Sequence, residues 1–176
     1  EKIAARYRLD RPDPNGDLHV AEMNAAGIHT AGFLIVDFGF AFPEAVPPLE
    51  ELYEMHHAMA LRHPGRFWVF AGIDPRRGPA GVDLFSRSLD EWGVRGLKLY
   101  PPCGFSPADR ALDPYYDLCA QHHIPVLTHT GPTSPTLSFQ HTRPTDVENA
   151  AHRFPGVNFI LAHGATVHRE DAALLA

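Results

Sequence analysis

Short runs of apolar residues recur along the chain, and each is followed by a segment with helical spacing. The runs cover residues 31–38, 67–74, 94–100, 124–130 and 157–163. They do not alternate between apolar and polar positions, which is typical of parallel strands covered on both faces. The segments that place apolar side chains on one helical face are residues 18–28, 48–63, 81–93, 113–123 and 144–154, with another starting after residue 167. We therefore predict a parallel α/β protein in which helices and strands alternate.

The spacing of the predicted strands limits the architecture. They begin at residues 31, 67, 94, 124 and 157, so each interval matches one strand–helix–strand unit. Two architectures fit this pattern, an open doubly wound sheet or part of an eight-stranded barrel. A doubly wound nucleotide-binding protein should carry a glycine-rich turn such as G-x-G-x-x-G, and the sequence has none. A barrel places functional residues at the carboxyl ends of several strands, and polar side chains stand at such ends here.

Composition fits a soluble globular protein. The 176 residues are 44% hydrophobic and 20% charged, which suffices for one domain with a sizeable core. A net charge of −6 argues against a nucleic-acid partner, and no apolar run is long enough for a membrane span. The two cysteines form no disulfide framework and fit the cytoplasm. We expect the polar, proline-rich residues 1–17 to form a loop or a poorly ordered segment.

Histidines end two of the predicted strands in the same way. The run IPVLTHTG brings His129 to the end of one strand, and FILAHG brings His163 to the end of the next. In a parallel barrel these ends lie at the same edge, so both imidazoles could converge on one metal ion. The alternative is that each is a core histidine bonded to a backbone carbonyl. The repeated position favours a shared site.

Other polar residues lie at or just past strand ends. Lys98 stands unpaired in the otherwise apolar stretch GLKLY, and Tyr100 ends that stretch. Because a buried ammonium is costly without a partner, Lys98 could meet a carboxylate, bind an anionic substrate or become carbamylated. It could also reach out to water. Asp74 could hold a metal-ligating histidine, pair with Lys98 or Arg76, or form a turn before Pro75.

A long loop follows the strand that ends in His129. Residues 131–145 exceed the usual strand–helix link and carry His141 and Arg143. Loops at this end of a barrel commonly shape specificity, so both residues are candidates for substrate binding. Arg143 could grip a carboxylate at two points, or it could be solvated near the next helix.

Three segments carry a resemblance to a known family. They resemble the amidohydrolase-related branch of the metal-dependent amidohydrolases. The segments are GVRGLKLYPP, FSPADRALDPYYDLCAQHHIPVLTHTG and HRFPGVNFILAHG. This branch includes enzymes similar to aminocarboxymuconate-semialdehyde decarboxylase. The resemblance runs from about residue 18 to 170 and implies a (β/α)8 barrel with a divalent metal, most often zinc. It also implies that His129 is a metal ligand on strand five. His163 would then be the strand-six histidine, which binds a second metal or contacts water or substrate.

The chain departs from the family pattern in two ways. It contains no His-x-His, which the first strand usually supplies, and no sequence for strands seven and eight, which carry an aspartate. We therefore expect residues 1–176 to be a single partial barrel domain with strands two to six. On this interpretation the chain is an internal piece of a longer enzyme. Upstream sequence should then reveal the His-x-His, and downstream sequence the aspartate.

The resulting hypothesis is a metal-dependent hydrolase that acts on a small amide, lactone or related carbonyl compound. A metal-activated water would attack the substrate, with His129 and His163 at the metal and Lys98 and His163 in catalysis. Tyr100, His141 and Arg143 would contact the substrate. A non-oxidative decarboxylase on the same scaffold is the first alternative, and a metal-free binding or scaffold protein is the second. The sequence leaves the oligomeric state open, including a homo-oligomer.

Overall fold

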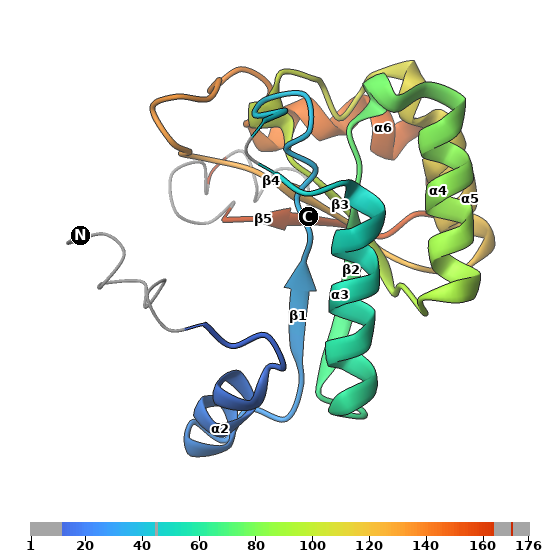
Figure 1. Ribbon diagram of the computed structural model, residues 1–176. Helices are drawn as coiled ribbons and strands as arrows, with labels where there is room; N and C mark the ends of the chain where they lie inside the picture. The colour runs from blue at the N-terminus through green and yellow to red at the C-terminus, as the bar shows by residue number, and fades with distance from the viewer. Residues whose placement is uncertain (1–11, 45, 164–169, 171–176) are drawn as a thin grey trace.

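The chain folds around one parallel sheet with helices that alternate with its strands (Figure 1). The computed structural model describes residues 12–44, 46–163 and 170. The strands are β1 (Ala31–Leu34), β2 (Phe67–Gly72), β3 (Gly96–Leu99), β4 (Val126–His129) and β5 (Phe159–Ala162). The helices are α2 (Asp17–Ala25), α3 (Leu49–Arg62), α4 (Gly78–Glu91), α5 (Asp113–Gln121) and α6 (Glu148–Arg153). None of the helices in the described part of the chain is long and apolar enough to cross a membrane.

The predicted order of helices and strands is confirmed within these residues. Each strand is shorter than its apolar run, because several runs continue into turns. The run 67–74, for example, leaves β2 at Gly72 and enters a short 3₁₀ helix at Pro75–Arg77. The predicted helix after residue 167 lies outside the described residues except for its position 170, and most of the segment 1–17 is also outside them.

The strand order distinguishes between the two architectures. The strands pair in parallel in the order β1-β2-β3-β4-β5, which is their order along the chain. A doubly wound sheet reverses direction at a switch point, and this sheet has none. An unbroken sequential order is that of a (β/α) barrel. The five described strands therefore form a half-barrel, as the barrel alternative predicted.

The two faces of the sheet have different surroundings. Val69, Leu97 and Val126 belong to one face and are buried in the main hydrophobic core together with helical side chains such as Phe85 and Tyr115. This face is the convex, outer face of the half-barrel. Covering it with helices removes apolar surface from water, which is the main force that stabilises the fold.

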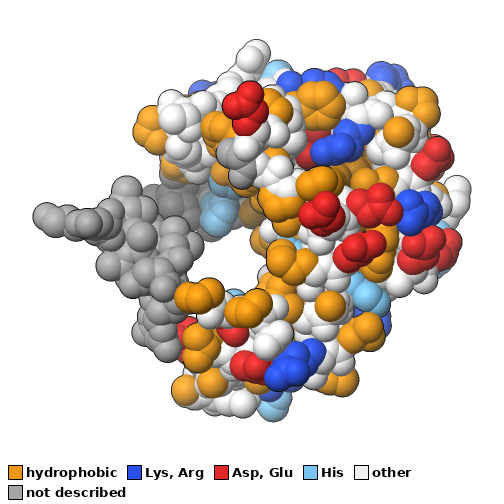
Figure 2. Space-filling view, viewed as in Figure 1, with side chains coloured by type: hydrophobic (Ala, Val, Ile, Leu, Met, Phe, Trp, Pro, Cys, Tyr) orange, Lys and Arg blue, Asp and Glu red, His pale blue; other side chains and the backbone are white. Residues whose placement is uncertain are grey.

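Large apolar side chains of the opposite, inner face are partly exposed. Leu34, Trp68 and Ile160 all project from this face and keep 43%, 53% and 38% of their surface accessible. Hydrophobic side chains border a hollow on the side of the molecule shown in Figure 2. The inner face of the half-barrel is thus open along β1, at the start of β2 and along β5, whereas Phe70 and Lys98 nearer its centre are buried.

Candidate active site

The parallel register brings several predicted site residues to one edge of the sheet. Lys98 on β3 is the register partner of Leu127 on β4. His129 on β4 is the register partner of Ala162 on β5, and His163 directly follows Ala162. The Tyr100 ring is 4.7 Å from the His129 ring, and the His129 ring is 5.1 Å from the His163 ring, measured between centroids. The structure therefore places Lys98, Tyr100, His129 and His163 in one group, which we call the strand-end group.

His129 is the buried imidazole of this group. Only 7% of its surface is accessible, and its Nε2 lies 3.1 Å from the carbonyl oxygen of Pro132. Burial lowers the pKa of His129, and the nearby charge of Lys98 lowers it further. His129 is thus held in the neutral form, which is the form of imidazole that binds metal ions.

His163 occupies a different environment. It is the first residue after β5, its side chain is exposed, and its backbone is left-handed with a φ of 60°. A residue with a Cβ adopts this conformation at a cost of about 1 kcal/mol or more. The turn directs the imidazole toward His129, which it meets edge to face.

Lys98 is buried without an acidic partner. Its side chain is 4% exposed, and no carboxylate in the described residues forms an ion pair with it. Its Nζ lies 5.6 Å from the centroid of the Tyr100 ring, close enough for a cation–π contact. Burial lowers the pKa of Lys98 to about 8. Within the described residues, Lys98 therefore has no carboxylate partner, which was one of the alternatives for it. It also does not reach out to water, which was another.

Asp74 pairs with Arg76 rather than with Lys98. Its carboxylate accepts hydrogen bonds from the backbone N–H of Arg76, at 3.0 Å, and from the guanidinium of the same residue. Both the turn and the Arg76 pair that the sequence suggested are thus present. Arg76 also donates a 2.9 Å bond to the carbonyl of Cys103, which ties the end of β2 to the segment after β3.

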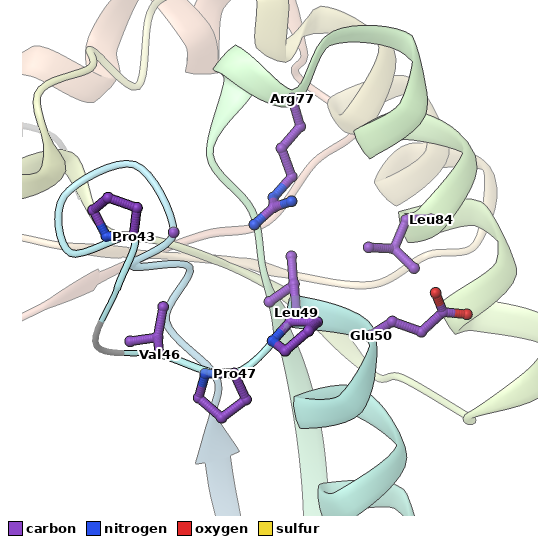
Figure 3. A pocket seen from close by; sticks show the side chains of 9 residues that line it. Pro43, Val46, Pro47, Leu49, Glu50, Arg77 and Leu84 are labelled. Atoms are coloured by element: carbon purple, nitrogen blue, oxygen red, sulfur yellow. The ribbon is translucent and has the colours of Figure 1, made fainter.

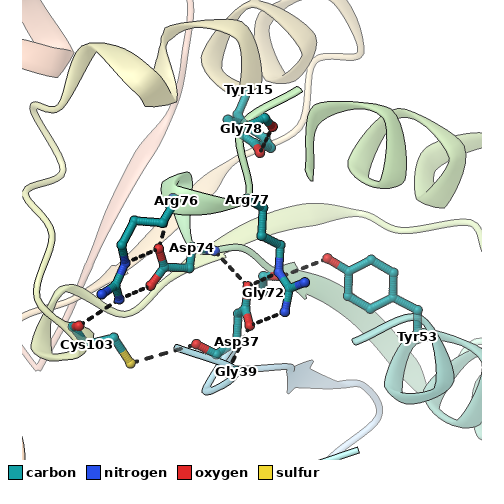
Figure 4. Close-up of polar contacts among 10 residues, drawn as sticks. All are labelled: Asp37, Gly39, Tyr53, Gly72, Asp74, Arg76, Arg77, Gly78, Cys103 and Tyr115. Atoms are coloured by element: carbon teal, nitrogen blue, oxygen red, sulfur yellow. Dashed lines mark hydrogen bonds and ion pairs between the residues drawn. The ribbon is translucent and has the colours of Figure 1, made fainter. Parts of the chain in front are cut away.

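Asp37 is a polar residue of this region that sequence analysis did not single out. It is 4% exposed, accepts a 2.8 Å bond from Arg77, and accepts a 2.9 Å bond from the backbone N–H of Asp74 (Figure 4). The thiol of Cys103 completes the network by donating to the carbonyl oxygen of Asp37. The loops that follow β1, β2 and β3 are therefore bonded to one another. The sequence feature that could have identified Asp37 is its position as an acidic residue near the end of the apolar run 31–38.

The long loop joins the strand-end group only in its first part. The Tyr100 hydroxyl is 2.9 Å from the hydroxyl of Thr133, so the loop covers the tyrosine. His141 is half-buried and Arg143 is exposed, with its backbone N–H bonded to Asp146. The structure gives neither of their side chains a hydrogen bond, ion pair or ring contact with His129 or Lys98. Their proposed role in substrate binding stays a prediction.

The fit of a metal ion can be judged from the donors present. His129 and His163 supply two imidazoles of suitable chemistry at one edge of the sheet. A protein-bound zinc ion takes at least three protein ligands, and the described residues contain no group of three or more histidine, cysteine or acidic side chains that could hold an ion. The strand-end group thus provides part of a ligand set.

The cavity in Figure 3 lies apart from the strand-end group. It has a volume of about 370 Å³ and is lined by the loop between β1 and α3, including Pro43 and Pro47, and by Arg77 and Leu84. None of Lys98, Tyr100, His129 or His163 lines it. Arg77 is already engaged by Asp37, so this cavity offers no unpaired charge from that residue.

Solved structures share this fold. One is the 5-carboxyvanillate decarboxylase of Novosphingobium aromaticivorans, complexed with manganese and a nitrobenzoic acid. It has a TM-score of 0.70 and 15% identity over 92% of this chain and 54% of its own. The 2,6-dihydroxybenzoate decarboxylase of Rhizobium gives 0.59 and 17% identity, over 84% and 55%. The 4-oxalomesaconate hydratase of Rhodopseudomonas palustris gives 0.65 and 18% identity, over 89% and 50%.

Each of these structures is matched over only part of its length. The chain spans about half the length of each of the three. No curated protein matches the sequence. A family model described as amidohydrolase, however, matches residues 16–176, which is nearly all of the chain. The sequential half-barrel agrees with that match. This chain belongs to the amidohydrolase family.

Proposed function

We propose that the chain forms part of a metal-dependent, non-oxidative decarboxylase that acts on a small aromatic acid. The observation that carries this proposal is the buried ammonium of Lys98, which no carboxylate of the described residues neutralises and which lies beside the ring of Tyr100. A buried cation without a partner is costly. A substrate carboxylate would supply the missing charge, and its ring could pack on the tyrosine.

The solved relatives support the same choice. Two of the three act as decarboxylases by name, and one of them is complexed with manganese and an aromatic acid. This favours the decarboxylase alternative over the hydrolase that the sequence suggested first. The hydrolase also needs a base that takes a proton from water, and the described residues place no carboxylate in the strand-end group.

The residues of the strand-end group would have different roles in substrate and metal binding. Lys98 would hold the substrate carboxylate, and Tyr100 would pack on the ring. His129 and His163 would contribute ligands to a divalent ion, which polarises a substrate oxygen when bound. The relatives include a manganese enzyme, so we propose a divalent ion without specifying zinc. When the bond to the carboxyl carbon breaks, the electron pair stays on the ring carbon, which then takes a proton as carbon dioxide leaves.

The reaction can be tested in the protein that contains this chain, loaded with Mn²⁺ in deuterated water. Aromatic acids should release carbon dioxide and gain deuterium at the vacated carbon. Lys98→Met should abolish this release, whereas Lys98→Arg should retain part of it because the charge remains. Lactones and amides in oxygen-18 water provide the opposing assay. Incorporation of oxygen-18 without release of carbon dioxide would establish hydrolysis and refute the proposal.

A further inference from the structure

Side chains from several parts of the chain contact Tyr100 and limit its position. The Phe38 ring, from the loop after β1, meets the Tyr100 ring edge to face, with centroids 5.5 Å apart. The His129 ring and the Lys98 Nζ lie 4.7 Å and 5.6 Å from the Tyr100 ring centroid. The hydroxyls of Tyr100 and Thr133 share a 2.9 Å hydrogen bond. Because a hydrogen bond is directional, this contact also fixes where the tyrosine hydroxyl points.

The loop that carries Thr133 is closed at its base and bonded to a neighbouring segment. The backbone N–H of Gly131 donates to the carbonyl oxygen of Thr142 at 2.8 Å, which joins the two ends of the loop. Gly131 has a φ of 90°, which a glycine adopts without steric cost. The N–H of Ser138 donates to the carbonyl oxygen of Pro102 at 3.1 Å, in the segment that follows β3. A loop with ends this close is an Ω-loop, so Thr133 stands on an anchored support.

The Tyr100–Thr133 hydrogen bond stands apart from the other polar contacts of the loop. In the described part of the chain, the two hydroxyls bond to each other and to no other side chain. The nearby Ser134 hydroxyl bonds within the loop, to the hydroxyl of Thr136 at 2.9 Å. A tyrosine hydroxyl that packs among protein groups needs a polar partner, and Thr133 supplies it. A change at Thr133 therefore reaches the strand-end group through Tyr100.

We propose that Thr133 is a positioning residue that makes the strand-end group select acids with a flat ring. It acts through Tyr100, whose ring it holds in contact with Phe38 and His129 and beside Lys98. Aromatic pairs depend on the relative orientation of the two rings, so a substrate ring gains affinity only from a tyrosine that is held in place. Lys98, by contrast, recognises the carboxylate whatever the ring. This role rests on the proposed function, because it concerns the same site.

Steady-state kinetics of the Mn²⁺-loaded protein that contains this chain tests the role with an aromatic acid that it decarboxylates. T133V keeps the shape of the side chain but loses the hydroxyl. It should raise KM by about threefold to tenfold and leave kcat nearly unchanged, since one neutral hydrogen bond contributes about this much and serves binding. T133S should restore the parent KM. S134A is the matched control from the same loop and should behave as the parent. A lower kcat at unchanged KM in T133V, or equal KM values in T133S and T133V, would overturn the proposal.

A double-mutant cycle decides whether Thr133 acts through Tyr100. Y100F, T133V and the double variant Y100F/T133V each break the same hydrogen bond, so all three should raise KM by the same factor. Additive effects of the two single changes would show that Thr133 acts by another route and would overturn the proposal.

Equilibrium binding separates this role from the reaction itself. In calorimetric titrations the parent protein should bind benzoate more tightly than cyclohexanecarboxylate, which lacks a flat ring. T133V should weaken benzoate binding by about the factor seen in KM and leave cyclohexanecarboxylate binding unchanged. If aromatic acids release no carbon dioxide but this difference is present, the decarboxylase proposal fails and the role of Thr133 stands. An equal preference for benzoate in parent and T133V, or a parent that binds neither acid, would refute the role of Thr133.

Discussion

The imidazoles of His129 and His163 meet edge to face, with ring centroids 5.1 Å apart, at the ends of neighbouring parallel strands. The two residues contribute differently to this pair. His129 is buried and kept neutral by its surroundings, whereas His163 is exposed and held by a left-handed turn. A buried neutral imidazole is already in the metal-binding form, so it should contribute more to binding than its exposed partner.

His129→Ala is therefore expected to weaken the binding of Mn²⁺ by about tenfold or more, since even residues that only orient a ligand contribute that much. Calorimetric titration of the purified protein with Mn²⁺ measures the change without relying on activity. His152→Ala is the matched control, because His152 is an exposed histidine on α6 that lies 3.6 Å from a carboxylate oxygen of Glu148 and outside the strand-end group. Unchanged Mn²⁺ affinity in His129→Ala would place the ion elsewhere.

Lys98→Met should make the protein more stable at neutral pH. The folded-state pKa of Lys98 is about 8, below the ordinary value of 10.5, because burial disfavours the ammonium. One pKa unit corresponds to about 1.4 kcal/mol, so the buried charge costs on the order of 3 kcal/mol of stability. Methionine fills a similar volume without a charge.

The pH dependence of that gain identifies its cause. Between pH 8 and 10.5 the unfolded chain binds a proton that folded Lys98 has lost, so the stability of the parent protein rises with pH in this window. The advantage of Lys98→Met should thus be complete below pH 8 and shrink toward pH 10.5 in denaturant unfolding. Lys98→Arg keeps the charge and should show no gain. An equal gain at all pH values would contradict the desolvation argument.

Asp37→Ala should destabilise the fold by about 3 kcal/mol, because it leaves Arg77 without its carboxylate and Asp74 N–H without its acceptor. Urea unfolding measures this difference. Asp17→Ala is the control, since Asp17 also binds an arginine at two points but at an exposed site. We expect little change there. A similar loss in both variants would show that burial of the Asp37 pair has no special importance.

The sequence predicted the fold well because each strand lay in a mostly apolar run and each helix had apolar side chains at helical spacing. It also predicted that His129 and His163 share an edge, since parallel strands end on the same side of a sheet. Neither inference needs atomic detail. Both follow from periodicity and chain order, which a single sequence displays directly.

Pairing between distant side chains could not be predicted in this way. Arg76 and Arg77 are neighbours, yet one binds Asp74 two residues away and the other binds Asp37 forty residues away. Which arginine turns toward which carboxylate depends on the 3₁₀ helix that follows β2. Asp74 therefore pairs with Arg76, and no carboxylate among the described residues pairs with Lys98. The sequence only suggested the turn on which this pairing depends.

The approach of β1 to β2 provides the last prediction. A Cβ placed on Gly72 would lie 2.2 Å from the carbonyl oxygen of Ile35 and 2.9 Å from the backbone nitrogen of Asp37. Both are backbone atoms, which cannot rotate away as a side chain can. Gly72 also accepts a 2.7 Å bond from Tyr53 and lies beside Lys98 in the sheet.

Gly72→Ala should therefore force β1 away from β2, disturb the Asp37 network and shift Lys98. We expect a loss of about 2 kcal/mol or more in the free energy of unfolding, together with weaker protection of β1 amides from hydrogen exchange. Gly156→Ala is the matched control, because a Cβ at Gly156 meets no atom within 4 Å and its φ is not in the left-handed region. If Gly72→Ala were as stable as Gly156→Ala, the close contact between the two strands would not be needed to hold Lys98 at the strand-end group.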